Sequence, residues 1–195
     1  MIRCFAELTP LCEHIHLPVQ SGSNNILARM QRGYSREDYL EKVHRLRQAC
    51  PGIALSTDLI VGFPGETQAD FEDTLRLMQE AAFDSVFYFK YSSRPRTAAA
   101  GFPDQVPEAL KTERLARLKE LQEQLSLASN QRWLGKVGRV LVEGFSKQQN
   151  SQLFGRLRSN QVVNFDGPQE LIGRTVRVHI SKAHLHSLGA LLCED

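Results

Sequence analysis

The feature that most constrains the fold is a change of pattern near residue 135. Before it, apolar segments rich in β-branched residues alternate with amphipathic segments of helical period. Strands are predicted at 13–20, 53–61 and 83–91, and helices from Ser35 to Pro51, from Thr67 through Met78 and from Pro107 to about Leu134. Such alternation is typical of parallel strands with helical crossovers, whose functional loops follow the carboxyl ends of the strands.

Local residues mark the ends of these helices. Ser35 to Asp38 and Thr67 to Asp70 both have the form of a capping box, and Pro107 suits a first helical turn. Gly135 supplies a stop for the third helix.

Beyond Gly135 the pattern becomes one of short strands separated by Gly, Asn, Ser and Asp turns. Five are predicted, at 137–143, 153–157, 161–165, 175–180 and 188–192. Five strands in about 60 residues favour a small closed barrel of the oligonucleotide-binding type. We therefore expect an α/β unit over 1–132, followed by an all-β barrel over 133–195.

Charge divides at the same boundary. The chain carries 24 Lys+Arg and 22 Asp+Glu, a formal net charge of +2, so a nucleic-acid surface would have to be local. Residues 133–195 hold eight basic and five acidic residues, a net +3, and the remainder has a net charge of −1. Either an RNA-binding surface or a solvated strand face explains this surplus.

Targeting and metal-binding patterns are weak. No apolar run approaches the ~20 residues that cross a bilayer, and the first residues lack signal-peptide order, so we expect a cytoplasmic protein without a membrane partner. No two of the four cysteines have metal-binding spacing. Cys12, His14 and His16 could share one face of a strand, but a metal site usually needs a fourth ligand from elsewhere in the chain, and barrel interiors also hold Cys and His.

Two loops follow predicted strands and contain glycines. Gln20 to Ser23 offers an amide, two hydroxyls and a glycine that permits close backbone approach to a ligand. Gly62 to Thr67 precedes a helix whose free N–H groups could hold an anion. A plain turn explains each loop as well, and neither matches a Walker or dinucleotide motif.

Other charged residues also leave two interpretations open. Arg94 and Arg96 flank Pro95 after the third strand, where they could clamp an anion or remain solvated. His179, His184 and His186 fit no zinc spacing, which indicates surface or RNA-facing positions.

Four segments taken in order carry a resemblance to a known family. They are HLPVQSGS at 16–23, DLIVGFPGET at 58–67, SRP at 93–95 with TAA at 97–99, and GRLRSNQVVNF at 155–165. In this order they resemble the methylthiotransferases of the radical S-adenosylmethionine superfamily, from about Cys12 to Cys193.

The resemblance implies an architecture of which this chain has a part. Family members have an N-terminal domain with an auxiliary [4Fe-4S] cluster, a partial (βα)6 TIM-like barrel with a second cluster and S-adenosylmethionine, and a TRAM barrel that binds RNA. We expect the C-terminal half of the TIM-like barrel and the TRAM domain here. Fifteen residues precede His16, so all six cluster cysteines are missing, and no catalytic residue or metal ligand is assigned. The isolated chain is expected to be inactive without the missing cluster domain and first half of the barrel.

The resemblance also assigns site residues. The expected cofactor-binding residues are Gln20, Ser21, Ser23, Ile60, Gly62, Glu66 and Arg94, with Ser93 near the mouth. The expected tRNA-binding residues are Arg156, Arg158, Asn160 and Arg174, while Phe165 is expected in the core. Arg96 stands where the family has a glycine, which puts that loop's conformation in question.

Within the family, the segment 155–165 is more similar to enzymes that modify adenosine beside the tRNA anticodon. The favoured product is 2-methylthio-N6-isopentenyladenosine. Alternatives are a non-catalytic RNA-binding module, an enzyme acting on a ribosomal protein, or one acting on another modified adenosine.

Overall fold

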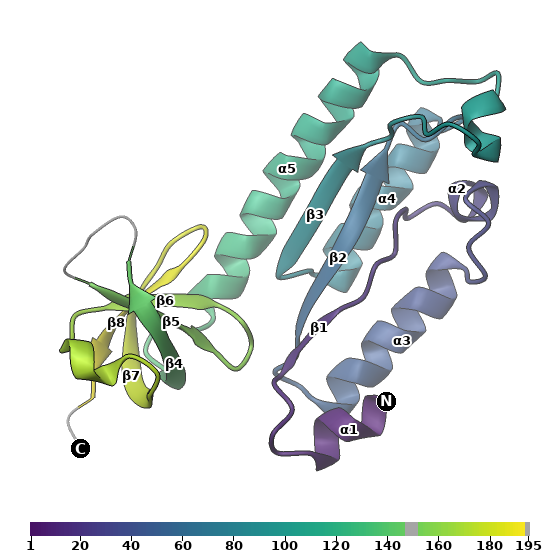
Figure 1. Cartoon of the computed structure of the whole chain (residues 1–195). Helices are drawn as coiled ribbons and strands as arrows, with labels where there is room; N and C mark the ends of the chain where they lie inside the picture. Colours follow the sequence, from purple (N-terminus) through teal and green to yellow (C-terminus); the bar gives the residue numbers. More distant parts are fainter. Residues whose placement is uncertain (147–151, 194–195) are drawn as a thin grey trace.

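The computed structural model describes residues 1–146 and 152–193. A long helix, α5 (Glu108–Gln131), joins a helix-and-sheet unit to a small barrel (Figure 1). No helix in the described part of the chain is long and apolar enough to cross a membrane.

The first unit is built on a three-stranded parallel sheet. Its order is β1 (His14–His16), β2 (Ala54–Val61), β3 (Ser85–Lys90). The helices before α5 are α1 (Ile2–Glu7), α2 (Asn24–Arg29), α3 (Arg36–Ala49) and α4 (Gln68–Ala81), with the short 3-10 helix η1 (Ala98–Gly101). This arrangement confirms the predicted alternation of strands and helices.

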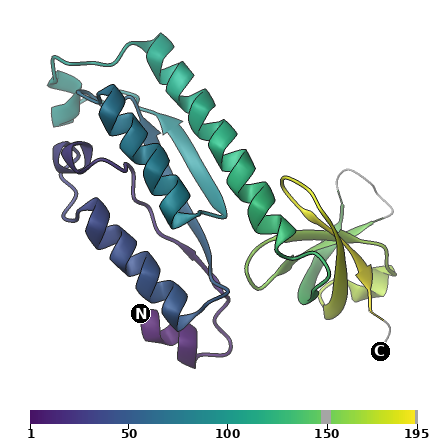
Figure 2. The ribbon, with the colours of Figure 1, turned by 180° about the vertical axis from the view of Figure 1, so that it is seen from behind.

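Helices cover one face of the sheet. Alternate residues of β2, including Leu55 and Leu59, pack in a core with side chains of α3, α4 and α5. In Figure 1 the strands lie in front of α4, and in the reverse view of Figure 2 α4 lies in front. The opposite face carries Phe87 and Phe89, which are 54% and 53% exposed.

Both predicted capping boxes are present. The Ser35 side chain accepts a hydrogen bond from the Asp38 N–H, and the Thr67 side chain accepts one from the Asp70 N–H. In each case the aspartate carboxylate accepts a hydrogen bond from the backbone N–H of the capping residue. Several predicted ends were wrong, and two of them have a clear local explanation. The first strand ends at His16, because Pro18 lacks an N–H and Gln20 has a φ of 75°. Helix α5 ends at Gln131, three residues early, and a turn leads to Gly135.

The second unit is a closed barrel with strand order β4-β5-β6-β8-β7. The strands are β4 (Val137–Phe145), β5 (Leu153–Leu157), β6 (Val162–Phe165), β7 (Thr175–Ala183) and β8 (Leu188–Leu192), and a 3-10 turn η2 (Gln169–Leu171) precedes β7. The β6–β8 pairing is parallel, and the other pairings are antiparallel. Phe165 is 1% exposed in the barrel core, as expected.

Candidate cofactor and RNA-binding sites

A cavity of about 640 Å³ lies beyond the carboxyl ends of β2 and β3. Three of the expected cofactor-binding residues line it, namely Gln20, Ile60 and Arg94. Gln20 adopts a left-handed backbone, and its N–H and C=O bond to the backbones of Asp58 and Ile60. The cavity therefore occupies the position that a parallel α/β sheet favours for a ligand.

The loop after Gln20 packs on helix α4 instead of lining this cavity. The Ser21 Oγ lies 3.5 Å from the Thr74 Oγ1, and the Gly22 N–H donates to the same Thr74 oxygen at 3.0 Å. The Ser23 hydroxyl caps α2 and donates to the Asp70 carboxylate. Ser21 and Ser23 are thus buried in a polar contact between two elements.

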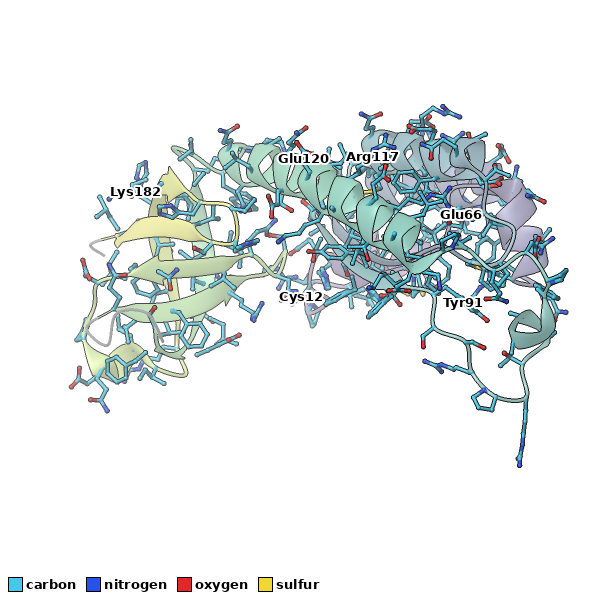
Figure 3. All side chains as sticks on the ribbon, turned by 90° about the horizontal axis from the view of Figure 1, so that it is seen from above. Cys12, Glu66, Tyr91, Arg117, Glu120 and Lys182 are labelled. Carbon is cyan, nitrogen blue, oxygen red and sulfur yellow. The ribbon has the colours of Figure 1, made fainter. Side chains whose placement is uncertain are left out.

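Glu66 and Gly62 are joined to helix α5. The Glu66 carboxylate accepts from the Gly62 N–H at 2.9 Å and from the Arg114 Nη1 at 2.6 Å. The side chain of Glu66 is only 1% exposed, and that of Arg114 is 3% exposed. Burial raises the pKa of Glu66, although the Gly62 amide and the Arg114 guanidinium oppose that rise. Figure 3 shows Glu66 beside α5, and neither Glu66 nor Gly62 lines the cavity.

The cavity has an aromatic wall that the sequence analysis did not assign. The Phe63 ring meets Tyr91 and Phe102 edge to face, with centroids 5.1 and 6.4 Å apart. Arg29 lies over Phe102, and its Nη2 donates to both carboxylate oxygens of Asp104. The available signals were Phe63 between the two glycines of its loop and Tyr91 at the end of an aromatic strand.

One polar atom in this wall is left without a partner. The Tyr91 hydroxyl is buried and forms no hydrogen bond with any residue that the structure describes. Buried hydroxyls are normally paired, so this atom lacks the partner that such a group usually has. Tyr91 is labelled in Figure 3 at the end of the sheet far from the barrel.

The loop that carries Arg94 has an unusual backbone at Arg96, where φ is 68°. A left-handed conformation is the one that glycine adopts most readily, so Arg96 holds a backbone conformation that is unfavourable for a residue with a side chain. Arg94 faces the cavity, whereas Arg96 and Ser93 are not among its lining residues.

Histidines and a carboxylate form a chain of contacts on the uncovered sheet face. The Ser56 Oγ lies 3.2 Å from the His14 Nε2 and 3.0 Å from the His16 Nδ1. The His16 Nε2 in turn lies 3.4 Å from the Asp58 carboxylate. Burial lowers the pKa of His14, the nearby Asp84 opposes that shift, and His16 and Arg156 reinforce it. Within residues 1–146 and 152–193, no three Cys, His, Asp or Glu side chains are grouped to hold a metal ion.

The four expected RNA-binding residues lie in different settings. Arg156 bonds the Asn160 carbonyl and amide oxygens and lies 3.3 Å from Glu143. Arg158 is directed at the first unit, where it contacts Glu13. Arg174 is exposed. The structure therefore brings Arg156 and Asn160 together, while Arg158 is engaged between the two units.

Two family models match separate parts of the chain. The family model of the Radical SAM superfamily matches residues 1–78, and that of the TRAM domain matches residues 131–192. A tRNA-2-methylthio-N(6)-dimethylallyladenosine synthase from Syntrophobacter fumaroxidans is 53% identical over the whole chain. One with the same name from Moorella thermoacetica is 55% identical over 94% of it. The chain spans 43% and 41% of the lengths of these two relatives.

A solved structure shows the same fold at low sequence identity. The coproporphyrinogen III oxidase HemN of Escherichia coli, described as a radical SAM enzyme, superposes with a TM-score of 0.51 at 16% identity. The superposition covers 90% of this chain and 44% of HemN. Residues 1–78 are therefore similar to the Radical SAM superfamily, and residues 131–192 are similar to the TRAM domain.

Proposed function

We propose that this chain is the C-terminal part of a tRNA methylthiotransferase, which adds a methylthio group to C2 of N6-isopentenyladenosine beside the anticodon. The observation that carries the proposal is identity of about 50% along the chain to relatives named tRNA-2-methylthio-N(6)-dimethylallyladenosine synthase. The whole protein would act in the cytoplasm, with tRNA as its substrate.

The cavity beyond β2 and β3 fits S-adenosylmethionine. Its volume of about 640 Å³ suits a cofactor site, and it combines an aromatic wall with a buried, unpaired Tyr91 hydroxyl. Arg94 would hold the methionine carboxylate, Ile60 and Phe63 would contact the adenine, and the Gln20 amide would bond a polar edge. When bound, S-adenosylmethionine supplies the hydrogen-abstracting radical and the methyl group.

The residues of this chain do not fit an iron–sulfur cluster. Cys4, Cys12, Cys50 and Cys193 are free, and no metal-ligating group of three is found among the described side chains. Four thiolates normally hold a [4Fe-4S] cluster. We therefore assign the two expected clusters to sequence outside these residues and expect no turnover by this chain alone.

Binding of S-adenosylmethionine to the 195-residue chain tests the cofactor site. Arg94→Gln should weaken binding about tenfold, because a charge-assisted hydrogen bond to the carboxylate is lost. Arg96→Gln removes the same charge from the same loop outside the cavity and should bind normally. Equal affinities of both variants, measured by isothermal titration, would exclude Arg94 from the site.

The activity is tested by joining this chain to the cluster-binding region of a relative. After reconstitution with iron and sulfide, digested tRNA should contain 2-methylthio-N6-isopentenyladenosine by mass spectrometry. An unchanged nucleoside profile with loaded clusters would contradict the proposal. If tRNA binding nevertheless persists, a non-catalytic RNA-binding module is favoured; methylthiolation of a ribosomal protein in place of tRNA would indicate the protein-modifying alternative.

A further inference from the structure

Two arginines lie opposite each other on the outside of the barrel. Strands β4 and β7 pair antiparallel, and their register places Arg139 directly opposite Arg177. Both residues are exposed, whereas Val140 and Val178, which follow them on the two strands, are fully buried. Residues in such positions have Cβ atoms about 4.5–5.5 Å apart. Two long cationic side chains therefore start side by side on the barrel surface.

Neither arginine has a partner in the described structure. Within residues 1–146 and 152–193, no group forms an ion pair, a hydrogen bond or a ring contact with the guanidinium of Arg139 or of Arg177. Like charges directly opposite each other on a sheet are destabilising. This pair therefore lowers the stability of the barrel, and no described contact offsets the loss.

The residues that flank the pair on the two strands include no carboxylate. The neighbouring opposite pairs are Val137 with His179 and Leu141 with Thr175. We name these four residues, together with the two arginines, the β4–β7 face. Its centre carries two positive charges that no acidic neighbour on these strand positions balances.

A third cation extends this surface. Lys136, which precedes β4, lines a cavity of about 380 Å³ together with Arg139. Its ammonium group lies 5.8 Å from the centroid of the Trp133 ring. The acidic residue that lines the same cavity, Glu13, is paired with Arg158. The positive surface thus continues from Arg139 to Lys136.

The arginines of the neighbouring strand are engaged by protein groups. In five-stranded barrels of the oligonucleotide-binding type, the second and third strands usually carry the ligand, and these are β5 and β6 here. On β5, however, Arg156 contacts Glu143 and Asn160, and Arg158 contacts Glu13. Two arginines without a described partner are found instead on the first and fourth strands of the barrel.

We propose that the β4–β7 face binds the phosphate backbone of the tRNA substrate, with Arg139 and Arg177 as a clamp. The inference rests on the proposed function, since it takes tRNA as the substrate. A guanidinium presents a planar set of donors that matches phosphate oxygens bidentately. A bound phosphate would also relieve the repulsion between the two cations. Such contacts carry no sequence information, so this face would position the tRNA without selecting its bases.

The salt dependence of tRNA binding tests the two contacts. With the 195-residue chain, Arg139→Gln and Arg177→Gln should each reduce the slope of log affinity against log salt by about one, and the double variant by about two. Each single substitution should weaken binding about eightfold at about 0.1 M salt, because one phosphate contact contributes about 0.9 log unit per tenfold change in salt. Fluorescence anisotropy of labelled tRNA measures both quantities.

Arg45→Gln is the matched control. It removes the same charge from an exposed position on α3, in the other unit, and should leave both the slope and the affinity unchanged. An equal change in Arg45→Gln would show that net charge alone sets the binding, and would contradict a site on the β4–β7 face.

A charge reversal separates binding from folding. Arg139→Glu places a carboxylate opposite Arg177, so it should raise the midpoint of thermal unfolding, because an opposite-charge pair replaces a like-charge pair. The same variant should bind tRNA more weakly than Arg139→Gln. Loss of both stability and binding would indicate that Arg139 supports the barrel itself, and would overturn the inference.

The outcomes separate this inference from the proposed function. If the wild-type chain binds tRNA and both glutamine variants keep its slope, the β4–β7 face is not the site, although the proposed function stands. The substitutions should also lower the slope in the chain joined to the cluster-binding region of a relative. An effect confined to the 195-residue chain would show that the added region covers this face, and would overturn the inference. If neither wild-type form binds tRNA, the inference and the proposed function are both contradicted.

Discussion

At the scale of single residues, two arginines of α5 differ in burial but share a neighbour. The guanidinium carbons of Arg114 and Arg117 lie 5.5 and 5.0 Å from the centroid of the Phe71 ring. Arg114 pairs with the buried Glu66, whereas Arg117 pairs with Glu72 at the surface. Arg114→Gln should lower the free energy of unfolding by about 3–5 kcal/mol, because it leaves a buried carboxylate unpaired. Urea titration measures the loss.

Arg117→Gln is the control and should cost at most about 1 kcal/mol, as exposed ion pairs do. The double variant Glu66→Gln with Arg114→Gln should be more stable than Arg114→Gln alone, because no charge is then left unpaired. If Arg114→Gln and Arg117→Gln lower the free energy of unfolding equally, the buried ion pair stabilises the fold no more than the exposed one.

Asp70 predicts a pH dependence of stability. Burial favours its neutral form, but bonds from Ser23, Thr67 and Asn25 outweigh burial and hold the pKa of Asp70 below its usual range. A lowered folded pKa stabilises the fold above the unfolded pKa of about 3.9, and this contribution is lost as pH falls through the folded value. Asp70→Asn should cost about 1–2 kcal/mol at neutral pH.

That difference in unfolding free energy should begin to shrink below about pH 4, where the Asp70 carboxylate of the unfolded chain takes up a proton, and it should vanish once the folded carboxylate is protonated as well. Urea unfolding from pH 7 to pH 3 measures it. A constant gap between the two proteins across this range would contradict the role of the Asp70 charge.

Residue types alone could identify which loops carry polar groups, but not the direction of each side chain. Gln20, Ser21 and Ser23 were all expected at the cofactor, yet only Gln20 reaches the cavity, because the chain turns there with a positive φ. Glu66 was assigned by position after its strand, and its partner Arg114 lies 48 residues away. No local pattern connects two residues at that separation.

At the scale of elements, Gly22 sets how closely the loop before α2 approaches α4. A Cβ at Gly22 would lie 2.5 Å from the Asp73 carbonyl oxygen and 2.5 Å from the Thr74 Cα. Gly22→Ala should therefore destabilise the chain by about 1–3 kcal/mol, since backbone must shift to admit a methyl group. Thermal unfolding measures the change.

Gly33→Ala provides the comparison, because no atom lies within 4 Å of a Cβ built there. Its effect should stay within about 0.5 kcal/mol. If Gly22→Ala and Gly33→Ala have the same melting temperature, the stability of the fold does not depend on close contact between this loop and α4.

Elements with strong local patterns were predicted well. Both capping boxes and the strands Leu153–Leu157 and Leu188–Leu192 were placed correctly. Helices α1 and α2, each of six residues, were missed because a short helix offers too few turns for a hydrophobic period. The close approach of Gly22 was foreseen, but toward a ligand; the structure shows it toward a helix.

At the scale of the whole molecule, the contact of Arg158 with Glu13 couples the two units. A double-variant cycle with Glu13→Gln and Arg158→Gln should give a coupling free energy of about 1 kcal/mol, limited by the partial exposure of both side chains. Small-angle scattering of Arg158→Gln should show a larger radius of gyration than the wild type. Arg174→Gln, which removes the same charge from an exposed position, should leave the radius of gyration unchanged. Equal radii of gyration for the two variants would show that other contacts hold the two units together.

The division into two units could be predicted from the pattern change near Gly135, whereas their arrangement could not. Arg158 was assigned to RNA by the family resemblance, and in the structure it contacts Glu13, 145 residues away in the chain. The strands of the barrel could be predicted from the turn residues between them. The side of the barrel that faces the sheet depends on contacts between residues far apart in the chain, such as Arg158 and Glu13.

Helix α5 is anchored at both ends, by Arg114 on Glu66 and by Asn130 on the His184 carbonyl. At 1.5 Å per residue, the sixteen positions from Arg114 to Asn130 form a spacer of about 24 Å. Inserting one residue between them would rotate one anchor by about 100° relative to the other, so both could not remain attached. Natural length variation in such chains should therefore fall in the loops and spare this interval.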